Sequence, residues 1–224
     1  MTSPAGNRAE LLDRALELFA AYGYDAVGVQ QICDAAALTK PTLYHYFGSK
    51  RGLLETLIDE RLQILLAALA RPAGQPEDMA AALERAARAM FVFARSHPSF
   101  YRLYLALWFA PMRSEAHEVA SQFHALHFEA LERICRGAMG EAGRRSRRRL
   151  FTAAFLGALN NDIGLALNDY SSLNEKLAGR LVRQFLYGVL ARPEAERRND
   201  VPAGKEEFGN RREAAARSGH AGVD

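Results

Sequence analysis

The chain has 224 residues, of which 49% are hydrophobic and 25% are charged, and its formal net charge is +3 at pH 7. This composition excludes a disordered chain, and the length allows one large or two small domains. We find no signal peptide, no apolar run that approaches membrane-spanning length, and no metal-ligand spacing of Cys33 and Cys135, and therefore expect a cytoplasmic protein with two buried thiols.

The first predicted helix covers Glu10–Tyr22 and follows a polar, loose arm over Met1–Arg8. Apolar residues recur in it at helical spacing, and Gly23 is a natural stop. A second, short helix is predicted over Val27–Ala36. These two segments precede the stretch around which the chain is organised.

That stretch contains a third short helix, predicted over Lys40–Phe47. Thr39 is a good N-cap because its hydroxyl can accept a bond from a backbone N–H that lacks a helical partner. Pro41 falls in the first turn, where its missing N–H costs nothing. Gly48 suits the position after the helix, and Ser49 can cap the next helix.

The two faces of this helix differ sharply. Leu43 and Phe47 lie four residues apart and can anchor it to a core, whereas Thr39 and the other positions supply hydroxyls, an imidazole and a cation. No Asp or Glu occurs between Ala35 and Leu54. A presented helix with hydrogen-bond donors and no acids suits the major groove of DNA. An ordinary core helix with a solvated polar face is the alternative.

A helix, a tight connection at Ala37-Leu38 and a second helix make a helix-turn-helix. The region Ala15–Asp59 resembles the DNA-binding region of the tetracycline-repressor (TetR) family. Two departures are Ala37, where the family usually has Gly, and Gly28, where Thr or Ser commonly caps the second helix. The matching residues are Ala15, Phe19, Gly23, Ile32, Ala36, Thr39, Thr42, Leu43, Tyr44, Tyr46, Phe47, Ser49, Lys50, Leu53 and Leu54.

The resemblance implies an all-α fold with a three-helix DNA-binding domain over residues 1–49 and a helical ligand-binding and dimerisation domain over 50–191. Residues 192–224 are polar and are predicted to form a disordered tail. The partners implied are operator DNA, a second copy of the chain and a small-molecule effector. We predict base contacts from Gln30, Lys40, Pro41 and Thr42, and phosphate contacts from Thr39, Tyr44, His45 and Lys50.

Four further helices are predicted over Lys50–Ala70, Pro76–Ser96, Ser99–Ala110 and Ser114–Gly137. In the resembled family, the first of these joins the two domains and conveys the signal between them. The basic cluster Arg144–Arg149 follows. A solvated charged connection is favoured there over a second DNA contact.

The segment Leu150–Leu167 is apolar on almost every face, and such a helix must be buried on all sides. A monomer cannot bury its outermost helix in this way. The last helix begins at a capping-box pattern, Ser172 to Glu175, and runs to Leu190. We therefore predict a homodimer in which Leu150–Leu167 and Leu173–Leu190 of each chain form a four-helix bundle.

The helices of the second domain combine many aromatic residues with a few polar ones, which is typical of a small-molecule pocket. We expect a largely apolar or aromatic ligand. The predicted lining residues are Leu62, Phe93, Tyr104, Trp108, Phe123, His127 and Asn161.

Two other functions stay open at this point. One is a DNA-binding regulator whose second domain only dimerises. The other, a metal-using enzyme built on His117, His124 and His127, has little support because His124 and His127 alone have a spacing that suits one ion. No phosphate-binding loop, nucleophile elbow or HExxH motif occurs. We predict no catalytic residue, no metal and no cofactor.

Overall fold

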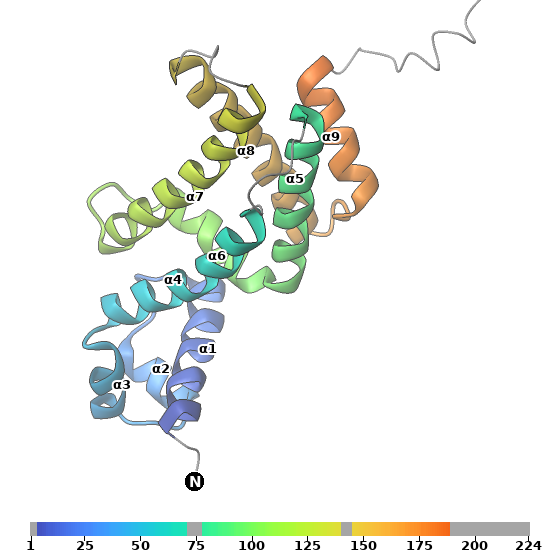
Figure 1. Ribbon diagram of the computed structural model, residues 1–224. Coiled ribbons are helices and arrows are strands. Elements are labelled where there is room, and N and C mark those ends of the chain that lie inside the picture. The colour runs from blue at the N-terminus through green and yellow to red at the C-terminus, as the bar shows by residue number, and fades with distance from the viewer. Residues whose placement is uncertain (1–3, 71–77, 140–144, 189–224) are drawn as a thin grey trace, which may run out of the picture. The chain divides into compact units, whose positions relative to one another are not determined.

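The computed structural model describes residues 4–70, 78–139 and 145–188, and these residues form helices and connecting turns (Figure 1). The predicted tail over 192–224, the helix end at Leu190 and the predicted helix start at Pro76 lie outside the described residues. Residues Met1–Leu186 form one compact unit, so the predicted boundary between residues 49 and 50 stays a prediction. The all-α fold is confirmed.

Three helices make up the N-terminal part: α1 over Pro4–Tyr22, α2 over Val29–Ala35 and α3 over Lys40–Phe47. Helix α4, Lys50–Leu69, leads from this group to the remaining helices (Figure 1). These are α5 over Met79–Ser96, α6 over Pro98–Trp108, α7 over Glu115–Met139, α8 over Arg145–Leu167 and α9 over Glu175–Tyr187. One continuous apolar core extends from Leu11 of α1 to Val182 of α9.

Several helix starts differ from the predictions, and those of α1 and α9 overturn a stated interpretation. Helix α1 begins at Pro4, so residues 4–8 are helical and not a loose arm. Arg8 is held there by an ion pair with Glu60, at 2.6 Å between nitrogen and oxygen. Helix α9 begins at Glu175, and its cap is the Asn174 side chain, which accepts a bond from the Leu177 N–H at 2.9 Å. The capping box from Ser172 is therefore wrong.

Helix α8 is not buried on all sides within one chain. One face packs into the core, through residues such as Phe155 and Leu159, while Leu150 is 73% exposed and Leu165 is 41% exposed. Among the described helices, α8 alone is long and apolar enough to span a membrane, which corrects the expectation that no segment approaches that length. Length and composition are weak evidence, because the core helix of a soluble protein passes the same test.

Candidate DNA-binding surface and effector site

The ends of α3 are formed as the sequence predicts. The Thr39 hydroxyl accepts a hydrogen bond from the Thr42 N–H at 3.4 Å and lies 2.9 Å from the Thr42 hydroxyl. Pro41 lies in the first turn. Gly48 follows the helix with a φ of 72°, a left-handed conformation that glycine adopts without strain. The N-cap and the glycine stop are confirmed.

The inner face of α3 is anchored by Leu43 and Phe47, which are 0% and 8% exposed. The opposite face is presented to solvent at the predicted positions, with Thr42 half-buried. The exposed members are Thr39, Lys40, Pro41, Tyr44 and His45. This arrangement leaves one cation, hydroxyls and an imidazole at the surface of a helix that the core holds in place.

Besides Thr39 and Thr42, which bond to each other, two more of the predicted DNA contacts are engaged within the chain. The Gln30 amide donates to the Asp34 carboxylate on the same helix at 2.6 Å. Lys50 points inward, and its ammonium donates to the carbonyl oxygens of Tyr24 and Val27, each at 3.0 Å. The Lys50 side chain therefore joins α4 to the turn before α2, a structural role that the sequence did not indicate.

The turn between α2 and α3 contains Ala37 in a left-handed conformation, with a φ of 52°. An alanine there is strained by about 1 kcal/mol relative to glycine. At the start of α2, Gly28 has no side chain to act as a cap, but its N–H donates to the Gln31 side-chain oxygen at 2.7 Å. Both departures from the family pattern are thus accommodated at a small local cost.

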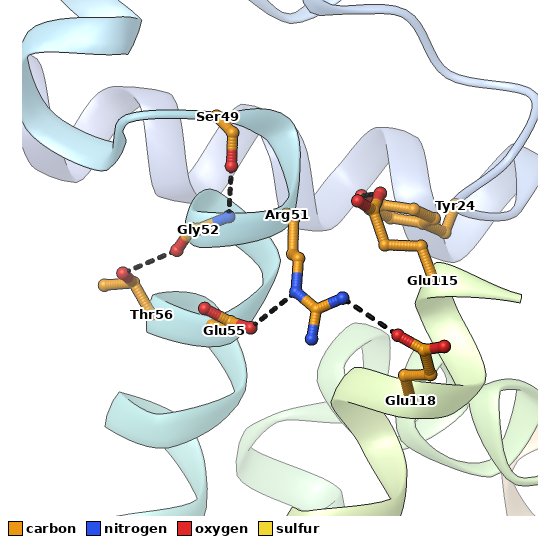
Figure 2. Close-up of polar contacts among 8 residues, drawn as sticks. All are labelled: Tyr24, Ser49, Arg51, Gly52, Glu55, Thr56, Glu115 and Glu118. Atoms are coloured by element: carbon orange, nitrogen blue, oxygen red, sulfur yellow. Dashed lines mark hydrogen bonds and ion pairs between the residues drawn. The ribbon is translucent and has the colours of Figure 1, made fainter.

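A set of polar contacts connects these N-terminal helices to α7 (Figure 2). The Tyr24 hydroxyl donates to Glu115, and the Arg51 guanidinium donates to Glu118 at 3.0 Å and to Glu55 at 2.9 Å. Burial and the contact with Glu115 raise the pKa of Tyr24 well above its ordinary value. The hydroxyl therefore keeps its proton and acts as a donor.

Most of the predicted ligand-binding residues are part of the packed core. Leu62, Phe93, Tyr104, Phe123 and His127 are each less than 10% exposed, and none of them lines either of the two hollows beside α7 and α8. Their inward positions follow helical spacing, which indicates burial but does not distinguish a core from a pocket.

The other two predicted residues, Trp108 and Asn161, do come together at a hollow of about 570 Å³ where α6, α7 and α8 meet. Its walls are mostly apolar, and no charged side chain is among the described residues that line it. The residues that sequence reasoning missed here lie on α6, α7 and α8 or shortly after α6 and α8. They are Leu105, Phe109, Phe128, Ala153, Leu156, Gly157, Asn160, Gly164, Leu165, Asn168 and Tyr170.

Beside this hollow, two buried histidines, His124 and His127, lie against Tyr104. The Tyr104 hydroxyl lies 3.4 Å from His127 Nδ1, and His124 Nε2 lies 3.3 Å from the Tyr104 carbonyl oxygen. Burial lowers the pKa of each histidine to about 4, so both are neutral at pH 7. Within the described residues, no group of three His, Cys, Asp or Glu side chains is placed to hold a metal ion. The metal-site alternative therefore gains no support.

The predicted basic cluster is only partly solvated. Arg148 and Arg149 both pair with Glu132, at 3.2 and 3.3 Å, and Arg149 also lies over the Phe128 ring. Arg144 lies outside the described residues.

The N-terminal helices match a known family. Residues 11–57 fit the family described as "Bacterial regulatory proteins, tetR family". The chain is 32% identical over 96 residues to the transcriptional activator FasR of Mycolicibacterium smegmatis, a match that covers 43% of this chain and 44% of FasR. It is 43% identical over 54 residues to the repressor KstR2 of Rhodococcus jostii, covering 24% and 26% of the two chains. The chain thus spans less than half the length of these relatives.

Longer matches are more distant. The regulator UidR of Escherichia coli K12 is 24% identical over 195 residues, which cover 87% of this chain and 85% of UidR. The fatty acid degradation regulator FadR of Bacillus halodurans has a TM-score of 0.69 at 17% identity, covering 86% of this chain and all of that one. FadR of Bacillus subtilis, solved with stearoyl-CoA, has a TM-score of 0.67 at 18% identity, covering 81% and 98%.

These solved structures support the fold alone, whereas the matched residues 11–57 contain the helix-turn-helix. The relatives with matching sequences are named as regulators of transcription, which agrees with the prediction that the chain is not an enzyme. The helix-turn-helix region of the chain, residues 11–57, belongs to the TetR family of bacterial regulatory proteins.

Proposed function

We propose that the chain is a cytoplasmic, homodimeric transcriptional repressor that binds a pseudo-palindromic operator and is released from it by a small, largely apolar or aromatic ligand. The observation that carries the DNA-binding part is α3, which is anchored by two buried residues and presents donors on its other face. A helix presented in this way fits the major groove, and two copies in a dimer would read two half-sites.

The DNA-binding part is tested on an operator selected from a random DNA library with the full chain. Lys40 is exposed at the first position of α3, so Lys40→Ala should change the preferred bases in the selected site. Lys176→Ala removes the same charge from an exposed position on α9 and is the matched control. Selection of no sequence by the wild-type chain would refute sequence-specific binding.

The sign of regulation is tested with a reporter gene placed behind the selected operator. A repressor lowers reporter expression, and loss of the chain restores it. Since FasR is named as an activator and KstR2 as a repressor, the relatives leave this choice to the measurement. Reporter expression that falls when the chain is removed would contradict repression.

The dimer is proposed to form through the exposed face of α8. Leu150 and Leu165 lie at the two ends of that face, with the small residue Gly157 between them, and an added Cβ at Gly157 would meet no atom within 4 Å. Gly157 and Leu165 also line the hollow between α6, α7 and α8, so a second α8 on this face would cover part of that hollow. Small residues allow close approach of a second helix, and a two-fold dimer would place the same face on both chains. The exposed positions of α9 include the cations Lys176, Arg180 and Arg183, so α8 is the better-supported centre of the interface.

Sedimentation of Leu150→Glu, at an exposed position outside the hollow, tests this interface, with Gln122→Glu on the exposed face of α7 as the control. The first substitution would place a carboxylate between two α8 helices, so this variant should be a monomer with weak DNA binding, whereas the control stays a dimer. A wild-type chain that is monomeric at micromolar concentration would refute the dimer. A change at Phe185 is less informative because its ring packs against Phe151 and Phe155 of its own chain.

The effector is proposed to bind in the hollow between α6, α7 and α8. Its walls carry asparagine side chains but no charge, which favours an uncharged apolar ligand that makes one or two hydrogen bonds. A long-chain alcohol such as 1-dodecanol is a suitable probe. Stearoyl-CoA, which the FadR structure of Bacillus subtilis contains, is the comparison, since its phosphates would have to stay outside the uncharged walls.

Trp108, the only tryptophan in the chain, lies at this hollow, so binding of the alcohol should shift its fluorescence in a saturable way. Tyr170→Ala should weaken that response, whereas Tyr187→Ala changes an exposed tyrosine outside the hollow and should not. The same alcohol should release the selected operator. If uncharged apolar compounds neither shift Trp108 emission nor release DNA, the second domain serves dimerisation alone.

A further inference from the structure

The first turn of α7 contacts both segments that flank the helix-turn-helix. Glu115 accepts a hydrogen bond from Tyr24, in the turn that precedes α2, and Glu118 accepts one from Arg51, in the first turn of α4 directly after α3. Figure 2 shows the two carboxylates beside these partners. The two acidic residues in one turn of α7 therefore contact the residues just before and just after the helix-turn-helix.

The partners of these two carboxylates are linked to each other through Lys50. The Lys50 ammonium lies 4.1 Å from the centroid of the Tyr24 ring and donates to the Tyr24 carbonyl oxygen. Arg51 is the next residue along α4 and also pairs with Glu55. Tyr24 and Lys50 are thus in direct contact, and Arg51 follows Lys50 in the chain. Glu115 and Glu118 of α7 bind Tyr24 and Arg51.

The directional character of these contacts distinguishes them from the neighbouring ones. The N-terminal helices also pack against the second domain where α1 meets α6, and both of these helices contribute residues to the apolar core. Apolar contact is non-directional, whereas an ion pair and a hydrogen bond fix the relative positions of their atoms. The contacts of Glu115 and Glu118 are therefore suited to set the orientation of the DNA-binding helices.

The same helix lines the proposed effector hollow. Phe128 of α7 is one of its walls, ten residues from Glu118, or about 15 Å along a helix that rises 1.5 Å per residue. A single rigid element thus extends from the hollow to Tyr24 and Arg51. A shift of α7 at Phe128 would move both carboxylates together.

We propose that Glu115 and Glu118 are positioning residues that fix the orientation of the DNA-binding helices on α7, so that occupancy of the hollow is transmitted to α3 along α7 as well as through α4. The transmission part rests on the proposed function. The orientation part does not, because it concerns contacts within one chain.

Orientation is measured as the distance between spin labels on Ala35→Cys in α2 and Arg136→Cys in α7, both exposed positions. Cys33 and Cys135 are buried, which protects them from labelling. The labelled chain is diluted with unlabelled chain so that only distances within one chain are read. The otherwise unaltered chain should give one narrow distribution, and both Glu118→Gln and Tyr24→Phe should broaden or shift it.

The matched control is Glu129→Gln, which removes the same charge from a position farther along the same helix, outside these contacts. It should leave the distance distribution unchanged. Thermal unfolding of each variant shows whether it is folded, and Tyr24→Phe keeps the buried ring while removing only the hydroxyl. Distributions that stay identical in folded Glu118→Gln and Tyr24→Phe would overturn the proposal.

DNA affinity gives a second readout on the selected operator. Glu118→Gln should weaken operator binding about two- to five-fold, which is the range expected for loss of an exposed ion pair. The DNA-binding helices would be less firmly oriented in this variant, and their ordering on DNA would cost free energy. Arg51→Met should weaken operator binding as well, and the double variant should bind no more weakly than Arg51→Met alone. Additive losses in the double variant would show that the two side chains act independently.

The transmission part is read as the ratio of operator affinities with and without saturating 1-dodecanol. This ratio should fall toward one in Glu118→Gln and stay at the wild-type value in Glu129→Gln. If the alcohol has no effect on the wild-type chain, the proposed effector is wrong, while the label distances still decide the orientation part. An unchanged ratio in Glu118→Gln would leave α4 as the route and refute transmission through Glu118.

Discussion

Lys50 and Tyr24 are joined in two ways, by the ammonium 4.1 Å from the centre of the ring and by the hydrogen bond from the same ammonium to the Tyr24 carbonyl oxygen. The bond to the Val27 carbonyl oxygen adds a third contact. These contacts hold the start of α4 against the turn before α2. Lys50, which the sequence predicted to bind a DNA phosphate, thus makes structural contacts between α4 and the turn before α2.

Lys50→Met should lower the free energy of unfolding by about 1–3 kcal/mol, since two carbonyl oxygens lose a charged donor and the ring loses a cation. Denaturant unfolding measures this loss, and Lys176→Met is a control at an exposed lysine. The salt dependence of operator binding separates the two roles. A variant that keeps its stability and whose salt slope falls by about one would identify Lys50 as a phosphate contact instead.

Ala37→Gly should stabilise the chain by about 1 kcal/mol because glycine adopts the observed φ of 52° without strain. Ala35→Gly, two residues earlier in α2, is the matched control and should destabilise by about 0.5–1 kcal/mol. Thermal unfolding of both variants checks the sign. Destabilisation by Ala37→Gly would mean that the turn is not left-handed in solution.

Gly52→Ala should destabilise the DNA-binding unit by at least about 2 kcal/mol. A Cβ at this position would lie 2.1 Å from the Phe47 carbonyl oxygen, a backbone atom that cannot move aside cheaply. The Gly52 N–H donates to the Ser49 hydroxyl at 2.9 Å, and the Gly52 carbonyl oxygen accepts from the Thr56 hydroxyl at 2.7 Å (Figure 2). Both polar groups of the Gly52 backbone are therefore fixed by side chains. Gly137→Ala in α7, where a Cβ meets nothing within 4 Å, should instead be mildly stabilising. Equal thermal stability of the two variants would contradict this close approach.

Acid should destabilise the chain through His124 and His127. Their pKa values are lowered to about 4 in the folded chain, against about 6.5 when unfolded, so the unfolded chain binds more protons between these values. The free energy of unfolding therefore falls as pH drops from about 6.5 toward 4, by at most about 1.4 kcal/mol per pH unit for each histidine.

Chemical denaturation between pH 7 and pH 5 measures this slope before most carboxylates titrate. His127→Leu should reduce it by up to half, and His117→Gln, at a less buried position on α7, is the control. An unchanged slope in His127→Leu would show that the imidazole is not kept neutral by burial.

The helix-turn-helix could be predicted closely because its signals are local. Thr39 caps α3 through a residue three positions away, and Gly48 ends the helix by its own backbone freedom. The start of α9 was misplaced for a related reason: Asn174 and Ser172 are both good caps, and only the path of the chain selects between them.

The proposed effector site could be predicted from the sequence only in its composition. Helical spacing identifies inward-facing aromatics, but it does not say whether a neighbouring helix fills the space beside them. Tyr104 and Phe123 are buried in the core, whereas Trp108 lies at the end of α6 and lines the hollow between α6, α7 and α8.

The sequence by itself determined the all-α fold, the exposed polar face of α3 and the resemblance of the helix-turn-helix region to the TetR family, because caps, turns and apolar periodicity act between residues a few positions apart. Only the tertiary structure decided that Arg51 meets Glu118, 67 residues away, and that Tyr24 meets Glu115, 91 residues away. Single charges and hydroxyls at helix ends are common in any sequence and have many potential partners. The packing of α7 against α4 selects these pairs, since it brings one turn of α7 within hydrogen-bonding distance of both ends of the helix-turn-helix.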